Sequence, residues 1–197
     1  MASFPPETDV QAWAVSLLDS ARLAHVRGVV ETAAALAVRY APGELTRVRL
    51  AGWIHDVAKH WDDAALLAYA AAHDLPVTPA ERQVPMLLHG AVAYDLARER
   101  FGLADESLRR ACALHTTGGP DMDAAAMIVY LADLIEPTRD FKGVKALRRE
   151  AERGLEPAVL RGADTVIKHL IRHQRLIDPR AVALRNALLA RGVRYSR

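Results

Sequence analysis

Residues 124–135 form a very apolar stretch that reads Ala-Ala-Ala-Met-Ile-Val-Tyr-Leu-Ala-Asp-Leu-Ile. Apolar residues on every side of a helical repeat predict a buried helix. We expect Asp121 to cap its first turn and Pro137 to end it. One carboxylate, Asp133, stands within these apolar surroundings, where an unpaired charge is costly. The stretch therefore predicts a helical core that holds a charged group with a partner, and a metal ion is one such partner.

The rest of the chain shows the same helical repeat, and little of the alternation that strands require. Proline and glycine divide it into segments, without an internal repeat or a long linker. We predict an all-α fold of about ten helices in one domain over residues 1–197, with its core at about 20–190 and a flexible tail at 1–8. The first predicted helix follows Pro6, and the second carries His25 and ends near Tyr40. The other eight cover about 44–56, 62–75, 87–101, 105–115, 124–135, 141–153, 156–175 and 179–191.

The composition excludes several classes of protein. Hydrophobic residues make up 51% and charged residues 25% of the 197 residues, which is ordinary for a globular chain. Cys112 is the single cysteine, so an intramolecular disulfide framework and a cysteine-based zinc site are excluded. No apolar run approaches the roughly 20 residues that cross a bilayer. The N-terminus lacks the basic start and apolar core of a signal peptide. We therefore expect a soluble, cytoplasmic protein without a membrane partner.

The net charge of +2 conceals an asymmetry. Residues 1–138 carry a balance of −7, and residues 139–197 carry +9. The basic C-terminal third has two interpretations, which are attraction of nucleic acid or another polyanion and pairing with the acidic part of the same fold. The second is favoured because the charges are spread at helical intervals. His169 and His173, although four residues apart, have basic neighbours that repel a cation, so we do not expect a metal there.

Four residues are candidates for a metal site because each lies in apolar surroundings. His55 and Asp56 directly follow the apolar segment Leu-Ala-Gly-Trp-Ile, and His25 and Asp133 belong to helices of their own. A buried imidazole beside a buried carboxylate is costly unless the two are hydrogen-bonded or hold a cation. Two imidazoles and two carboxylates form a mixed site that suits iron, manganese or zinc better than calcium. Such a site leaves positions for water and for a substrate oxygen.

The order His25, His55-Asp56 and Asp133 resembles the H…HD…D pattern of the HD-domain metal-dependent phosphohydrolases. His89 and His115 match the extended pattern, in which two metals are usually held. The local sequence is most similar to one branch, the YqeK-type symmetrical bis(5'-nucleosyl)-tetraphosphatases. The similar segments, over roughly residues 20–190, are Arg22-Leu-Ala-His-Val-Arg-Gly-Val, His55-Asp-Val-Ala-Lys, His89-Gly-Ala, Phe101-Gly, His115-Thr-Thr-Gly and Ala132-Asp-Leu-Ile-Glu-Pro-Thr-Arg-Asp-Phe.

The resemblance implies a role for each matching residue. His25, His55, Asp56 and Asp133 would ligate metal, with Asp56 as the bridge if two ions are present. The residues implied in catalysis are Asp56, Lys59, His89 and His115. Two of these, His89 and His115, would ligate a second metal or contact phosphate. The residues implied in substrate binding are Lys59, His89, His115, Thr116, Gly118 and Arg139.

The resemblance also implies the activity. The expected reaction is hydrolysis of diadenosine tetraphosphate to two ADP by a metal-activated water, with one or two iron ions, or manganese, as the cofactor. The residue chemistry alone supports hydrolysis of a phosphate compound. Two alternatives stay open: an HD-type phosphohydrolase with another nucleotide substrate, and a nucleotide- or RNA-binding protein that uses the basic C-terminal third. The expected partner is the small dinucleotide or ADP rather than nucleic acid, and a homodimer is a possible assembly.

Overall fold

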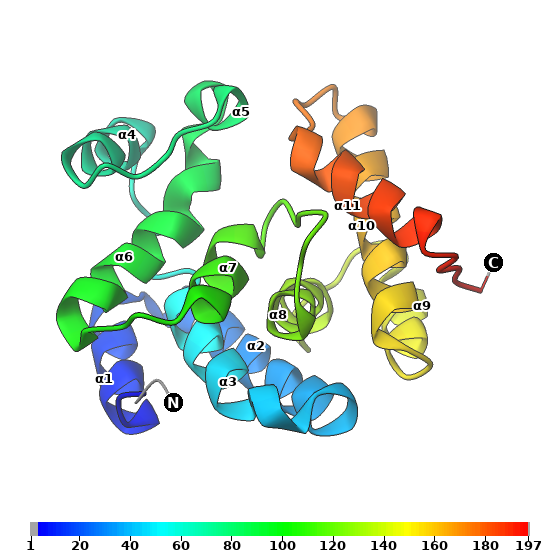
Figure 1. Ribbon diagram of the computed structural model, residues 1–197, viewed down its shortest axis with the longest axis horizontal. Helices are drawn as coiled ribbons and strands as arrows, with labels where there is room; N and C mark the ends of the chain where they lie inside the picture. Colours follow the sequence, from blue (N-terminus) through cyan, green and yellow to red (C-terminus); the bar gives the residue numbers. More distant parts are fainter. Residues whose placement is uncertain (1–3, 197) are drawn as a thin grey trace.

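The structure, a computed structural model, describes residues 4–196 (Figure 1). Within that range the chain forms eleven α-helices, two 3-10 turns and no strand, which confirms the predicted all-α class. The α-helices are α1 (Glu7–Leu17), α2 (Ser20–Tyr40), α3 (Leu45–Ile54), α4 (Asp63–Ala72), α5 (Pro79–Gln83), α6 (His89–Phe101), α7 (Glu106–Leu114), α8 (Ala124–Ile135), α9 (Val144–Ala151), α10 (Leu155–Arg172) and α11 (Pro179–Ala190), and the 3-10 turns are η1 (Pro42–Glu44) and η2 (Pro85–Leu88).

Helix α8 is the central element of the bundle. It packs against α2, α3 and α7 on one side and against α10 on the other. In Figure 1 it is seen almost end-on, between the α2–α3 pair and the group formed by α9, α10 and α11. One cluster of buried apolar side chains extends from Val10 in α1 to Leu188 in α11. This continuity supports the single-domain prediction, which stays a prediction.

Several helices begin at an acidic residue whose side chain accepts a hydrogen bond from the first turn. Asp19, Asp62, Asp105 and Asp178 cap α2, α4, α7 and α11 in this way. Such caps satisfy backbone N–H groups that have no partner inside the helix. Helix α8 is capped by Asp123, which accepts from the N–H of Ala126. The expectation that Asp121 supplies this cap was wrong.

The segment between α4 and α6 differs from the prediction. It contains α5, a helix of five residues, followed by the 3-10 turn η2, and neither was predicted. Thr78 and Glu81 form a capping box, in which each side chain binds the backbone N–H of the other residue. Helix α6 then begins at His89 and ends at Gly102, whose φ of 66° suits glycine.

Part of the segment 1–8, which was predicted to be a flexible tail, is helical. Residues 1–3 lie outside the described range, and helix α1 already begins at Glu7. The Glu7 carboxylate accepts hydrogen bonds from Arg49 Nε at 2.7 Å and from Trp53 Nε1 at 3.0 Å. Because these contacts fix the start of α1 on α3, residues 7 and 8 belong to the folded bundle.

None of the helices in the described range combines the length and the apolar character that are needed to span a bilayer.

Candidate metal centre

Five helices bring six potential metal ligands to one place beside α8. His25 lies in the second turn of α2, and His55 and Asp56 directly follow α3. His89 begins α6, and His115 follows α7. The sixth, Asp133, lies in the last turn of α8. All are buried except Asp133, which is half-buried, so the cluster lies inside the bundle with one partly open side.

Three of the four imidazoles are oriented in the same way, by a backbone carbonyl three residues earlier. The Nδ1–H of His55 donates to the Gly52 carbonyl at 2.8 Å, that of His89 to Met86 at 2.5 Å, and that of His115 to Cys112 at 2.7 Å. A carbonyl only accepts, so each contact places the ring proton on Nδ1 and leaves Nε2 without a proton. Each of the three Nε2 atoms is therefore in the form that binds a metal ion.

His25 is oriented differently, by a carboxylate. Its Nδ1 lies 3.0 Å from Oε1 of Glu136, a fully buried side chain just beyond α8. Its Nε2 lies 3.0 Å from Oδ1 of Asp133. A histidine held between a carboxylate and a metal ion is a common arrangement in metal sites, because the carboxylate fixes the ring and makes it more basic. Sequence reasoning gave no role to Glu136.

The two aspartates lie among these Nε2 atoms. Oδ1 of Asp56 is 3.1 Å from His89 Nε2 and 3.7 Å from His115 Nε2. Its Oδ2 is 3.6 Å from both His25 Nε2 and His55 Nε2. Asp56 thus has one oxygen toward each pair of imidazoles, as a ligand that bridges two ions would have.

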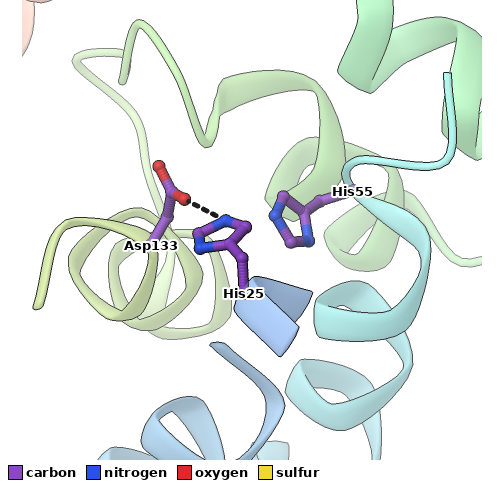
Figure 2. Close-up of side chains that lie close together, drawn as sticks. All are labelled: His25, His55 and Asp133. Carbon is purple, nitrogen blue, oxygen red and sulfur yellow. Dashed lines mark ion pairs between the residues drawn. The ribbon is translucent and has the colours of Figure 1, made fainter. Parts of the chain in front are cut away.

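Two buried nitrogens indicate that a cation fits here. His25 Nε2 and His55 Nε2 are inaccessible to solvent, and neither has a hydrogen-bond partner of good geometry. In the view of Figure 2 the His25 ring lies between Asp133 and His55, with one nitrogen toward the Asp133 carboxylate. The ligand atoms of His25, His55 and Asp133 lie within 4.8 Å of one another, as do those of His55, Asp56 and His115. Buried polar atoms are rarely left unpaired, and a divalent metal would satisfy these.

The protonation states suit the same interpretation. Burial lowers the pKa of His55 and of His89 to about 4, so both imidazoles are neutral at pH 7, the form that binds metal. Burial opposes ionisation of Asp56, but the neighbouring imidazoles, His55 first, hold the pKa of this carboxyl far below its usual range. The pKa of Asp133 is also lowered, against burial, by its contact with His25 and by the charge of Arg139.

Cations lie around the partly open side of the cluster. Arg22 Nη1 donates to Asp56 at 2.9 Å, and Arg139 Nη2 donates to Asp133 at 2.6 Å. Lys59 Nζ lies 3.4 Å from His89 Nε2, and burial lowers the pKa of this ammonium. A hollow of about 500 Å³, which we call the mouth, is lined by Arg22, His25, Arg139 and Phe141 among others. The mouth thus presents two guanidinium groups, together with the carboxylates of Asp19 and Asp140, to an entering ligand.

The two remaining predicted residues differ in their position. Thr116 Oγ1 lies 3.0 Å from His115 Nε2 and so belongs to the edge of the cluster. Gly118 is buried, with φ of 68°, and a Cβ atom there would meet Leu184 of α11 at 2.4 Å. A left-handed turn packed under α11 explains the requirement for glycine at position 118, and the contact of this residue with a nucleotide stays a prediction.

A second group of possible ligands, His73, Asp95 and Glu99, lies between α4 and α6. Asp95 already accepts hydrogen bonds from Arg98 and Tyr69, so its carboxylate is satisfied without a metal.

Comparison with known proteins agrees with this geometry. The HD domain family model matches residues 22–138. A curated relative from Halalkalibacterium halodurans, named symmetrical bis(5'-nucleosyl)-tetraphosphatase, is 33% identical over 85% of this chain and 89% of its own length. A relative of the same name from Bacillus subtilis is 30% identical over 80% of this chain and 84% of its own.

The fold has been seen in a crystal structure as well. A protein from Clostridium acetobutylicum, described as a predicted HD superfamily hydrolase involved in NAD metabolism, superposes with a TM-score of 0.89. It is 31% identical, and the match covers 96% of this chain and 100% of the other. The ordered cluster of histidines and aspartates, the family match and these relatives lead to one conclusion. The chain belongs to the HD domain family of phosphohydrolases.

Proposed function

We propose that the protein hydrolyses diadenosine tetraphosphate symmetrically, to two ADP, with one or two divalent ions at the candidate metal centre. The observation that carries the proposal is the convergence of four imidazoles and two carboxylates, with three Nε2 atoms left unprotonated because backbone carbonyls hold the ring protons on Nδ1. Iron is the preferred ion and manganese the alternative, since a mixed nitrogen and oxygen site suits both.

The choice of substrate is supported by the curated relatives. Both named above carry the name symmetrical bis(5'-nucleosyl)-tetraphosphatase, and both align with at least 80% of this chain. The mouth is consistent with a polyphosphate, because Arg22 and Arg139 line it. A planar guanidinium presents two parallel donors that match phosphate oxygens.

The residues of this chain would act by position and charge. Bound metal would supply a nucleophilic water at neutral pH and stabilise negative charge on the phosphate oxygens. Arg22 and Arg139, which pair with Asp56 and Asp133, are placed to turn toward an entering phosphate chain. Lys59 is fixed beside His89 and would neutralise charge that develops in the transition state.

The chemical step is a simple displacement. The water oxygen forms a bond to one of the two central phosphorus atoms, and the bond from that phosphorus to the oxygen bridging the central pair breaks. The bridging oxygen leaves with the second ADP, and the proton released by the water passes to solvent or to a basic group nearby. Asp56 lies within 4 Å of four imidazole nitrogens and is our candidate to orient the water.

A nucleotide profile tests the proposal. The protein, loaded with Fe²⁺ without oxygen or with Mn²⁺, is incubated separately with diadenosine tetraphosphate, ATP, AMP, a cyclic dinucleotide and guanosine tetraphosphate, and the products are resolved by ion exchange. We expect turnover of diadenosine tetraphosphate to be at least about a hundredfold faster than that of the others. Faster turnover of another nucleotide would support a phosphohydrolase activity but refute diadenosine tetraphosphate as the substrate.

A further inference from the structure

A second hollow lies beside the basic C-terminal third of the chain. It lies between α10 and the segment that follows α8, measures about 490 Å³, and is lined by Arg139, Phe141, Lys142, Thr165, Lys168 and Arg172 among others. We call it the α10 hollow. Its volume lies within the range of sites for small ligands, which is roughly 300–1,000 Å³.

Three of the four lysine and arginine side chains that line the α10 hollow lack carboxylate partners, and the fourth, Arg139, pairs with Asp133. No aspartate or glutamate lines it, and within the described residues Lys142, Lys168 and Arg172 form no ion pair. Elsewhere in the basic third, Arg180 pairs with Asp178, and Arg185 pairs with Asp164. Pairing within the fold therefore explains part of the positive charge, and the cations of the hollow remain available to an anion from outside.

The α10 hollow is connected to the metal centre through two shared residues. Arg139 and Phe141 line both the mouth and the α10 hollow, and the mouth also contains the metal candidate His25. Arg139 also connects the two spaces electrostatically, because its guanidinium donates a hydrogen bond to Asp133 of the metal centre. A phosphate chain held at the centre would thus extend past Arg139 into the hollow.

The side chains of the hollow offer separate surfaces for a base and for phosphates. Phe141, Leu134 and Val166 are partly buried and apolar, so they offer area to a flat ring. Thr165 donates its hydroxyl to the Arg161 carbonyl, so its oxygen still accepts a hydrogen bond, for example from an exocyclic amine. The three unpaired cations lie around this apolar surface, as phosphate recognition requires.

We propose that the α10 hollow is the subsite for one nucleoside of the substrate and for the phosphates that lead to it. The proposal rests on the proposed function and adds a reason for the substrate class. A nucleotide with a single nucleoside would occupy the mouth alone, whereas a dinucleoside polyphosphate would occupy both spaces and gain the contacts of Lys142, Lys168 and Arg172.

The test uses a double charge reversal and a matched control. The variant K142E/K168E changes two cations of the hollow. The control K145E/R149E changes two exposed cations of α9 that do not line it. Binding of diadenosine tetraphosphate is measured by calorimetry in EDTA, so that the readout does not depend on turnover. Thermal unfolding of each protein verifies that it is folded.

We expect the dissociation constant to rise by at least about tenfold for K142E/K168E at low salt, and by less than about threefold for the control, since only charges close to phosphate contribute strongly. The KM of the metal-loaded enzyme should rise in parallel. Equal effects of the two double variants on the dissociation constant, or on the KM of the metal-loaded enzyme where the metal-free protein does not bind, would overturn the proposal. The proposal would also be overturned if K142E/K168E lost affinity only for a single-stranded RNA oligonucleotide, because the hollow would then be a nucleic-acid site.

The outcomes separate this proposal from the proposed function. A wild type that binds diadenosine tetraphosphate through Lys142 and Lys168 but does not cleave it would refute the function and keep the subsite. A wild type that releases ADP with unchanged KM in K142E/K168E would keep the function and refute the subsite.

Discussion

Glu136 Oε1 lies 3.0 Å from His25 Nδ1, although 111 residues separate the two in the chain. This contact decides which nitrogen of His25 faces the metal centre, since Nδ1 is occupied by the carboxylate and Nε2 points toward Asp133. The backbone N–H and the hydroxyl of Thr138 also bind the Glu136 carboxylate, so it is fixed in turn. The pair links the end of α8 to α2 at the base of the site.

The first prediction concerns this carboxylate. Glu136→Gln keeps the shape and removes the charge, so His25 loses its anionic partner. We expect the affinity for Mn²⁺ to fall by about 10–100-fold, as is usual when an outer partner of a histidine ligand is changed. Calorimetric titration of the metal-free variant measures it, with Glu156→Gln, at the exposed ion pair to Arg191, as the control. An unchanged affinity would show that Glu136 is structural only.

The second prediction concerns the space that Glu136 needs. A Cβ atom on Gly28 would lie 2.5 Å from Glu136 Oε2, so Gly28→Ala must displace this buried carboxylate. We expect a loss of about 1–3 kcal/mol in the free energy of unfolding, as for overpacking, together with weaker Mn²⁺ binding. The same substitution should cost much less in a Glu136→Ala background. Gly43→Ala, with no atom within 4 Å of the new Cβ, is the control. Equal costs in the two backgrounds would contradict the proposed contact.

The helical bundle could be predicted because it depends on local signals. The set of six candidate ligands could be named only through the resemblance of their order to a known family, since they lie far apart in the chain, and their role in metal binding stays a prediction. The apolar repeat and the proline and glycine stops predicted the ten longer helices, and burial of Asp133 indicated a cation. Glu136 was missed because its partner is distant in the chain, although its place between an apolar helix and Pro137 resembles that of Asp133. Helix α5 was missed despite the visible capping box of Thr78 and Glu81. Its five residues are too short for the apolar repeat to appear.

The third prediction concerns Gly118, which the sequence placed at the substrate. The structure packs it beneath Leu184 with a positive φ, so Gly118→Ala should lower the free energy of unfolding by about 2–4 kcal/mol through backbone strain and overpacking. Below the unfolding temperature, the KM for diadenosine tetraphosphate should stay within about twofold of the wild type. Denaturation and steady-state kinetics are both required. A raised KM in a Gly118→Ala variant of unchanged stability would support a contact between Gly118 and the nucleotide.

The fourth prediction concerns the start of α1. The hydrogen bond from Arg49 lowers the pKa of Glu7 below the usual range of a glutamate carboxyl, against partial burial. A carboxyl whose pKa is lower in the folded state stabilises the fold above its unfolded pKa, and this stabilisation is lost as the pH falls through the folded value. Glu7→Gln should therefore unfold at a lower temperature than the wild type at pH 7, and the difference should shrink below about pH 4.5. A difference that is the same at pH 3 and pH 7 would exclude the ion pair as its source.

The central claim is that the metal centre is responsible for symmetrical cleavage. Its most direct test is a titration in which Fe²⁺ or Mn²⁺ is returned to chelated protein, and bound metal and nucleotide products are measured in the same samples, for the wild type and for Asp133→Ala. We predict that ADP is the sole product, that its rate rises in proportion to bound metal, and that Asp133→Ala loses both metal and activity. ADP formed by metal-free protein, an active Asp133→Ala variant without metal, or ATP with AMP as products would contradict the account.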